Sequence, residues 1–141
     1  MRLRRAKPEF DLEIPDGFPV YHDTDGCDLM LCIGAPLGDP QATVIGVTKG
    51  ERAASREEHV ARVRAARPEA QLVDEAPMPL AGLESWWTID TSVVAQDTLV
   101  RDSWMLVRSG VGWTVTAQLP WTQVNRQRKG AIAIVSTLRF L

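Results

Sequence analysis

The chain has 141 residues, a formal net charge of −2 from 16 basic and 18 acidic residues, and 45% hydrophobic residues. This length is typical of a single domain, residues 1–141, whose core is large enough to fold without a metal or a disulfide. The balanced charge argues against a dedicated nucleic-acid-binding protein, which usually has a marked basic excess. No apolar run could span a bilayer and no signal-peptide pattern follows the N-terminus, so we expect a cytoplasmic protein that does not bind membranes.

The first half of the sequence predicts short strands separated by turns. Residues 10–14 alternate between apolar and charged side chains, which is typical of a half-buried strand. The dipeptide 25–26, Asp-Gly, favours a tight hairpin turn between predicted strands at 20–23 and 27–33. A β-branched run at 42–48 predicts a further strand.

The hydrophobic period then changes to that of a helix. Ser55 and Glu58 have the spacing of a capping box, and Pro68 prevents continuation, so we predict a helix over 56–67. Its apolar stripe is thin, and we therefore expect it to lie on a sheet with much of its surface in solvent. Residues 71–80 are extended in this prediction, and their two prolines place them at a sheet edge.

The clearest pattern is an antiparallel β-meander. Three runs alternate with period two, at 86–93, 99–107 and 111–119. Their connectors, 95–97 and 109–110, are too short for anything but antiparallel neighbours.

The last segment predicts a closing helix over 122–137. Ala131, Val135 and Leu138 fall on one helical stripe, although the β-branched residues there also have strand propensity and Gly130 weakens a helix by about 1 kcal/mol. Together these elements predict an α+β fold, with an antiparallel sheet of six to seven strands flanked by two helices.

The titratable residues give no catalytic constellation. We expect His22 beside a hairpin turn and His59 on the solvent face of the predicted helix, and neither has a nucleophile that it could orient. Asp90 and Asp102 lie on neighbouring predicted strands, near Glu84, and two facing carboxylates can in principle do acid–base work. We interpret them as solvated strand positions, and predict that the protein is not an enzyme.

Metal and cofactor sites are not indicated either. Residues 23–28 resemble a calcium loop superficially, but the twelfth position counted from Asp23 is Gly34 instead of the required glutamate. Cys27 and Cys32 have an odd separation within one predicted strand, so they point to opposite faces and cannot pair there. We interpret them as small buried side chains of a reducing compartment.

The basic residues cluster at two places that we interpret as a solvated tail and a solvated helix face. The first cluster is Arg2, Arg4, Arg5 and Lys7, and the second is Arg126, Arg128 and Lys129.

Five tryptophans are unusual in a chain of this length. Trp86 and Trp87 are consecutive in a predicted strand and so point to opposite faces, while Trp104 and Trp113 lie on the neighbouring strands. Tryptophan fills large core volumes and also dominates binding hot spots. We expect at least two indoles in the core, and take Trp86, Trp87, Trp104 and Trp113 as candidate partner-binding residues.

The order of these elements resembles a known family. The strand at 10–14 precedes Pro15-Asp16-Gly17-Phe18, a hairpin and a capped helix follow, Gly82 precedes the meander, and the chain closes with a helix and residues 134–140. This resembles the PsbP-like α/β/α sandwich superfamily, which includes DcrB-like bacterial proteins and chaperones of type VI secretion effectors. The resemblance implies a small non-enzymatic domain that binds another protein, and it supplies no catalytic residues.

These observations predict a cytoplasmic protein-interaction domain without a cofactor, and the resemblance suggests a secretion-associated chaperone or adaptor. Its partner would be a client protein or a second copy of the chain in a homodimer. Two alternatives stay open: a small-molecule-binding domain or enzyme with a tryptophan-lined pocket between sheet and helix, and a nucleic-acid accessory protein that uses the second basic cluster. A closed cavity near Trp104 or Trp113 into which Arg101, Asp90 or Glu84 points would favour the first alternative, and a flat apolar face would favour the interaction domain.

Overall fold

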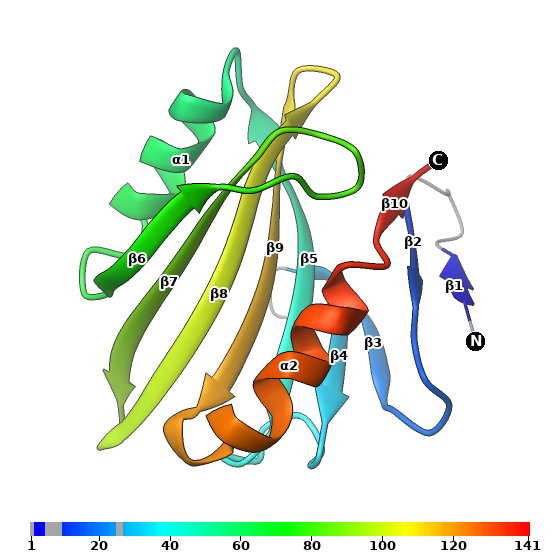
Figure 1. Cartoon of the computed structure of the whole chain (residues 1–141), viewed down its shortest axis with the longest axis vertical. Helices are drawn as coiled ribbons and strands as arrows, with labels where there is room; N and C mark the ends of the chain where they lie inside the picture. The colour runs from blue at the N-terminus through cyan, green and yellow to red at the C-terminus, as the bar shows by residue number, and fades with distance from the viewer. Residues whose placement is uncertain (1, 5–9, 25–26) are drawn as a thin grey trace.

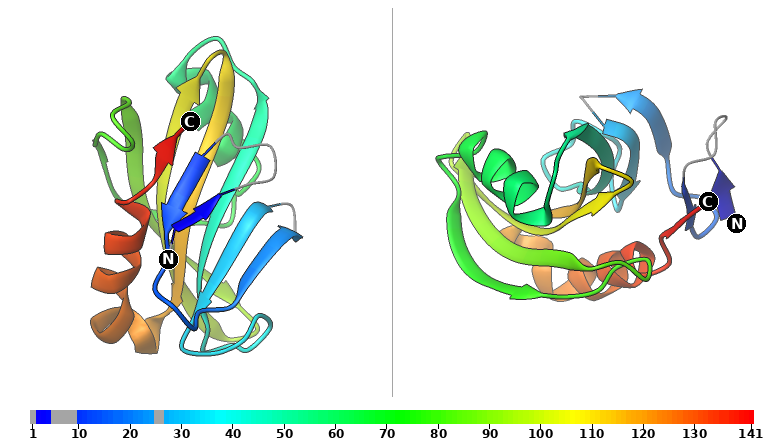
Figure 2. Two further views of the ribbon diagram at one scale, coloured as in Figure 1. Left: turned by 90° about the vertical axis from the view of Figure 1, so that its right-hand side faces the viewer. Right: turned by 90° about the horizontal axis from the view of Figure 1, so that it is seen from above.

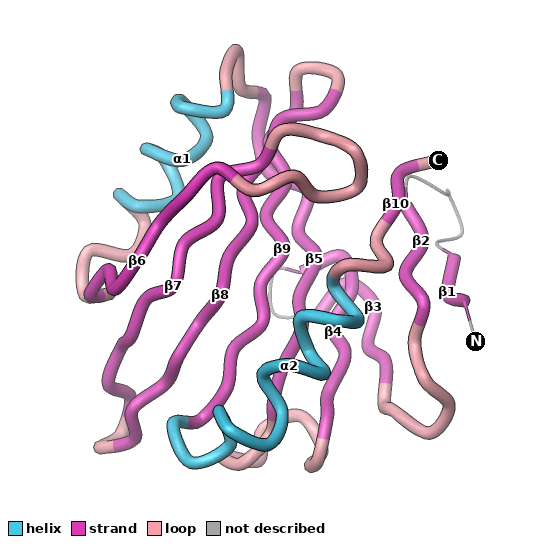
Figure 3. Tube along the Cα trace, in the orientation of Figure 1, coloured by secondary structure: helices cyan, strands magenta, loops and turns pink. Residues whose placement is uncertain are grey.

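The architecture centres on one long antiparallel sheet (Figures 1 and 3). The computed structural model describes residues 2–4, 10–24 and 27–141. Within these residues the large sheet has seven strands in the order β3-β4-β5-β9-β8-β7-β6. The strands are β3 (Val20–Thr24), β4 (Cys27–Ile33), β5 (Thr43–Arg52), β6 (Gln71–Pro77), β7 (Ser85–Val94), β8 (Asp97–Arg108) and β9 (Val111–Pro120).

A second, smaller sheet joins the two ends of the chain. It has three strands in the order β1-β2-β10, formed by β1 (Arg2–Arg4), β2 (Phe10–Glu13) and β10 (Arg139–Phe140). The sequence did not predict β10, because two residues are too few to show a period. It also did not predict β1, since Arg2 and Arg4 belong to the cluster that we had interpreted as a solvated tail; Arg5 and Lys7 lie outside the described residues.

Two helices cover opposite faces of the large sheet (Figures 1 and 2). Helix α1 (Arg56–Ala65) packs on β8 and β7, whereas α2 (Val124–Val135) packs on β9 and β5 and follows a 3₁₀ turn, η1 (Trp121–Gln123). This arrangement confirms the predicted α+β fold of a sheet flanked by two helices. It also confirms the meander, in which β7, β8 and β9 pair in sequence order.

The hairpin turns of the meander have the geometry that their tightness requires. Ala95 and Gln96 have φ values of 49° and 69°, and Ser109 and Gly110 have 52° and 74°. Two consecutive residues with positive φ form a type I′ turn, whose twist matches that of the flanking strands. The predicted turn at 25–26 lies outside the described residues.

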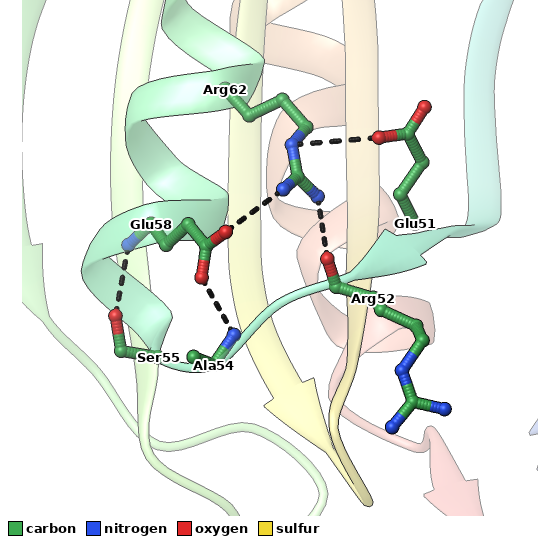
Figure 4. A network of polar contacts seen from close by, with 6 residues as sticks. All are labelled: Glu51, Arg52, Ala54, Ser55, Glu58 and Arg62. Carbon is green, nitrogen blue, oxygen red and sulfur yellow. Dashed lines mark hydrogen bonds and ion pairs between the residues drawn. The ribbon is translucent and has the colours of Figure 1, made fainter.

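The capping box of α1 forms with one change of partner (Figure 4). The hydroxyl of Ser55 accepts a hydrogen bond from the Glu58 N–H at 3.1 Å. The Glu58 carboxylate reaches back to the N–H of Ala54 at 2.7 Å, one residue before the cap. Both bonds satisfy donors at the start of the helix, which explains why it begins where the sequence predicted.

The core lies on the α2 side of the sheet. Burial along β9 alternates: Trp113, Val115 and Ala117 are at most 2% exposed, whereas Thr114 and Thr116 between them are half-buried. The same cluster of buried residues includes Phe10 from β2 and Val135 from α2. Cys32 is a buried free thiol on the other face, and burial raises its pKa; the side chain of Cys27 is not described.

The two core tryptophans confirm the prediction that at least two indoles are buried. Trp104 is 3% exposed and Trp113 is 2% exposed. Trp113 makes edge-to-face contacts with the rings of Phe10 at 5.7 Å and Phe140 at 5.1 Å. It therefore joins the small sheet to the large one.

We predict that Trp113→Ala lowers the free energy of unfolding by about 3–5 kcal/mol, because it leaves a cavity among β2, β9 and β10. Chemical denaturation followed by circular dichroism measures this change. Trp121, which is 65% exposed, provides the matched control. A loss for Trp113→Ala no larger than that for Trp121→Ala would contradict the assignment of Trp113 as a core residue.

Candidate functional site

The structure corrects the expectation for one of the two histidines. His22 is exposed, as expected, but His59 is only 3% exposed instead of lying on the solvent face of α1. Its Nε2 lies 3.0 Å from the carbonyl oxygen of Trp113 and 3.0 Å from the hydroxyl of Thr114. The helix turns His59 and Val60 toward the sheet, because glycine backbone beneath the ring leaves room for it.

The expectation of solvated carboxylates was also wrong. Asp102 is 0% exposed, and its oxygens accept hydrogen bonds from Trp87 Nε1 at 3.0 Å and from Arg128 Nε and Nη2 at 2.9 and 2.8 Å. Hydrogen bonding to Asp102 raises the pKa of Arg128. Arg128 is thus an ion-pair partner of the sheet instead of part of a solvated helix face, whereas Arg126 and Lys129 are exposed.

Asp90 has a similar role on the other face. It is 8% exposed, and the guanidinium of Arg67 donates to both of its oxygens at 3.3 and 3.4 Å. Asp90 lies next to Arg101 in the register of β7 and β8, and Glu84 is exposed. Asp90 and Asp102 are each held by a guanidinium donor, which suits a carboxylate that stabilises the fold better than one that exchanges protons.

The four candidate tryptophans divide into three environments. Trp104 and Trp113 fill the core, so a partner cannot reach their indoles in this structure. Trp87 is half-buried on the α2 face and donates to Asp102. Trp86 is half-buried on the α1 face, where its Nε1 donates to Glu75 at 3.0 Å and the Arg56 guanidinium lies 5.5 Å from its ring centroid. Only Trp86 reaches a face that is not fully covered, and its binding of a partner stays a prediction.

A large hollow lies on the half of the α1 face that α1 does not cover. We call it the strand groove. Its floor comes from β4, β5, β9 and β8, and its rim from the 37–40 loop and the 94–97 turn; the floor residues used below are Met30, Val44, Thr48, Leu99, Arg101, Thr116 and Gln118. Its volume is about 680 Å³. The groove contains no tryptophan, so it differs from the tryptophan-lined pocket of the alternative hypothesis.

Helix length explains why the groove is open. Helix α1 has 10 residues and is about 15 Å long, whereas β8 has 12 residues and is about 40 Å long. One short helix near one end of β7 and β8 therefore leaves the other end bare. On the opposite face, α2 and the small sheet together fill the corresponding space.

The groove combines apolar and polar side chains. Met30, Val44 and Leu99 supply apolar surface, while Arg101 and Gln118 lie side by side and share hydrogen bonds, including one of 3.2 Å from Arg101 Nε. Residues of β4, β5 and β9 that face this side alternate with the core residues. That alternation was visible in the sequence, but the position of α1 along the strands, which decides where the groove lies, was not.

A smaller hollow of about 240 Å³ lies beside Arg67 and Asp90, and two of intermediate size lie elsewhere on the surface. One, of about 450 Å³, is formed by α1 and the β6–β7 edge around Trp86. The other, also about 450 Å³, lies between α2 and the chain after β2, against Phe18 and Gly130. Neither contains a nucleophile placed beside a base.

In the part of the chain that the structure describes, neither a cluster of metal ligands nor a membrane-spanning helix is present. No three His, Cys, Asp or Glu side chains in it are grouped as metal ligands. Residues 25–26 of the calcium-loop candidate lie outside that part. None of its helices combines the length and the apolar character needed to cross a membrane.

Comparison with solved structures identifies the fold. LpqN, which is involved in cell envelope biogenesis of Mycobacterium tuberculosis, superposes with a TM-score of 0.69 at 11% identity, over 99% of this chain and 89% of LpqN. PA94, a protein of unknown function from Pseudomonas aeruginosa, superposes with a TM-score of 0.67 at 13% identity, over 97% of this chain and 94% of PA94. The cyanobacterial PsbP of Synechocystis sp. PCC 6803 superposes with a TM-score of 0.65 at 10% identity, over 100% of this chain and 92% of that protein.

The chain therefore has the PsbP-like fold, as the sequence resemblance predicted. At these identities the similarity concerns the fold alone. None of the three proteins is described as an enzyme. No protein-family model and no curated protein sequence matches the chain.

We predict that Arg128→Met lowers the free energy of unfolding by about 3 kcal/mol, because it leaves the Asp102 carboxylate buried without its cationic partner. Arg126→Met, on the exposed side of the same helix, is the matched control and should change stability by less than about 0.5 kcal/mol. Urea denaturation of both variants measures the difference. Equal effects of the two substitutions would show that the ion pair does not hold α2 on the sheet.

Proposed function

We propose that the chain is a non-catalytic protein-binding domain and that the strand groove is the surface on which its partner binds. The single observation behind this proposal is the unequal covering of the sheet. One face is closed by α2 and the small sheet, while half of the other face carries half-buried side chains that no element of the described residues covers. A surface of this kind, apolar with polar groups among the apolar ones, is typical of protein interfaces.

The dimensions of the groove fit a segment of polypeptide. Its floor and rim involve five neighbouring strands, from β4 to the end of β7. At about 4.8 Å between strands this is roughly 19 Å, the length of about six extended residues or about thirteen helical ones. The groove therefore has room for an apolar segment of a client, as a chaperone or adaptor of secretion would require.

The polar contacts of the domain support a non-catalytic role. Asp90 and Asp102, the two carboxylates that the sequence singled out, are held by guanidinium groups, and His59 is buried beneath α1. None of these three side chains lines the strand groove. The groove thus offers shape and hydrogen-bonding groups without the nucleophile–base pair that acyl or phosphoryl chemistry requires.

The compartment belongs to the proposal as well. We propose that the chain acts in the cytoplasm, as the sequence indicates, although LpqN has a role in the cell envelope. Fractionation of cells that carry the full-length gene product distinguishes the two locations. Recovery with the envelope would move the partner search to envelope proteins without changing the binding surface.

We predict that Thr116→Arg weakens partner binding by at least about tenfold, or about 1.4 kcal/mol, because Thr116 lines the groove from its middle strand, β9, and a long charged side chain would fill it. Partners are first captured by cross-linking in extracts of the source cells. Affinity of the purified pair is then measured by calorimetry at pH 7.5.

Thr98→Arg is the matched control, because Thr98 is an exposed strand residue that pairs with Val93 and is not part of the groove. It should leave the affinity unchanged. Equal binding by a correctly folded Thr116→Arg variant would place the interface elsewhere, for example around Trp86. Light scattering tests whether the partner is a second copy.

The alternative of a small-molecule-binding domain has one specific observation in its favour. Arg101, Gln118 and Thr116 place polar groups together in a hollow of ligand size. Native mass spectrometry of the protein purified from its source cells tests it. A bound small molecule that Thr116→Arg removes would favour this alternative over a protein partner.

A further inference from the structure

We propose that α1 is a releasable cover of the sheet, held by the neutral imidazole of His59, and that mild acid releases it and lengthens the strand groove. The consequence for binding rests on the proposed function. The release itself is a property of the isolated chain and can be tested without a partner.

The hydrogen bonds of His59 fix which ring nitrogen carries the proton. Nε2 lies 3.0 Å from the carbonyl oxygen of Trp113, which can only accept, so Nε2 carries the hydrogen. The other nitrogen, Nδ1, is then a bare acceptor. It is the one buried side-chain nitrogen or oxygen in the described part of the chain without a hydrogen-bond partner. Protonation would create a buried N–H at Nδ1 with no acceptor, which is costly.

The ring lies directly against strand backbone, which leaves no room for an acceptor to approach. A Cβ atom added to Gly112 would lie 2.3 Å from Nδ1, and one added to Gly50 would lie 3.6 Å from Cε1. These two glycines of β9 and β5 form the surface on which the imidazole packs. The two glycines therefore leave a space that fits the ring, and the backbone they present to Nδ1 carries no carboxylate.

Charged groups on α1 and β5 near His59 also disfavour its protonation, and Figure 4 draws their contacts with Arg62. The guanidinium of Arg62 donates to the carboxylate of Glu58, also on α1, at 3.1 Å. From β5, the Glu51 carboxylate lies 3.7 Å from this guanidinium, and the Arg52 carbonyl accepts a hydrogen bond from it at 3.0 Å. Residues 112–114 of β9, which lie beneath the ring, are not charged. Both acidic groups are thus engaged with Arg62. Burial lowers the pKa of His59, the Trp113 carbonyl opposes this shift, and the Arg62 charge adds to it.

The other contacts of α1 and of the residues that follow it, which include the Arg67–Asp90 ion pair, are made by groups other than histidine. Val60 is its one buried apolar side chain. Arg64 contacts Glu75 at 2.7 Å near the surface, and such exposed pairs contribute little. The hydrogen bond from Arg64 lowers the pKa of Glu75, so this pair stays ionised well below the range in which a histidine titrates. Acid release in that range would therefore report His59.

The direction of the pH effect follows from the lowered pKa. The free ring has a pKa of about 6.5, and the docked ring has a lower one, so the released state binds more protons at any pH between the two. Docking is unaffected above about pH 6.5. Below it, the docking equilibrium falls by up to about tenfold per pH unit until the pKa of the docked ring is reached.

Release of α1 would extend the strand groove along the same face. Thr114 and Met105 lie beneath or beside the helix, and Ser103, next to Met105, is paired across the strands with Thr116 of the groove floor. The core is on the opposite face, so the sheet would stay folded. Acid would thereby extend the open surface from half of this sheet face to the whole of it.

Hydrogen–deuterium exchange of the isolated chain at pH 7.5, 6.5 and 5.5, corrected for intrinsic exchange rates, tests the proposal. We expect protection of residues 56–65 to fall by up to about tenfold between pH 7.5 and 5.5, with up to about half of this factor, roughly fivefold, lost between pH 6.5 and 5.5, while β8 and β9 keep theirs. His59→Gln, which can still donate to the Trp113 carbonyl but does not titrate, should remove the pH dependence. His22→Gln, at the other histidine of the chain, should behave like the wild type.

Three outcomes would overturn the proposal. These are unchanged protection of α1 at pH 5.5, loss of protection in β8 and β9 together with α1, and a pH dependence that survives in His59→Gln. If that variant does not fold, an NMR titration of the wild-type His59 ring replaces it, and a ring pKa at or above 6.5 in the docked state would contradict the account. Because the Thr116→Arg test is done at pH 7.5 with a partner, the two proposals can fail independently.

Discussion

The sheet is longer than the helices that cover it, and most features of this domain follow from that mismatch. Strand β8 has 12 residues and α1 has 10, so the helix covers less than half the length of the strand. On the α2 side, β2 and β10 from the two ends of the chain cover the part of the sheet that α2 does not reach. On the α1 side nothing in the described residues does so, and the strand groove is the result. The described residues therefore close one face of the sheet and leave half of the other face open.

Buried polar contacts hold the two covering helices in place, and they differ in kind. Helix α2 is held by a charged pair, in which the fully buried Asp102 accepts hydrogen bonds from Arg128 and Trp87. Helix α1 is held by a neutral group, the His59 imidazole, whose Nδ1 has no partner. A satisfied ion pair persists across the physiological pH range, whereas an imidazole changes its charge within it. We infer that α2 stays docked over this range and that α1 is the cover whose docking responds to pH.

Local patterns in the sequence predicted the elements, but not the environment of individual side chains. The meander, the capping box of Ser55 and Glu58, and the edge position of 71–80 depend on neighbours in sequence, and all three are present. The burial of His59 and Asp102 depends on contacts with residues more than 25 positions away, Trp113 and Arg128, which no local period encodes. The groove was missed for the same reason, because it is defined by where α1 ends along the strands. Gly50 precedes and Gly112 follows the helix in the sequence, each within a predicted strand or next to one. Two glycines on the strands could have indicated room for the His59 side chain against the sheet.

The central claim is that partners bind on the open face. Hydrogen–deuterium exchange of the chain with its captured partner bound, compared with the chain alone, tests it most directly. The account predicts added protection in the 37–48 segment and in residues 97–101 and 116–118, which form the groove and its rim. Protection confined to α2 and the small sheet, with these segments unchanged, would contradict it.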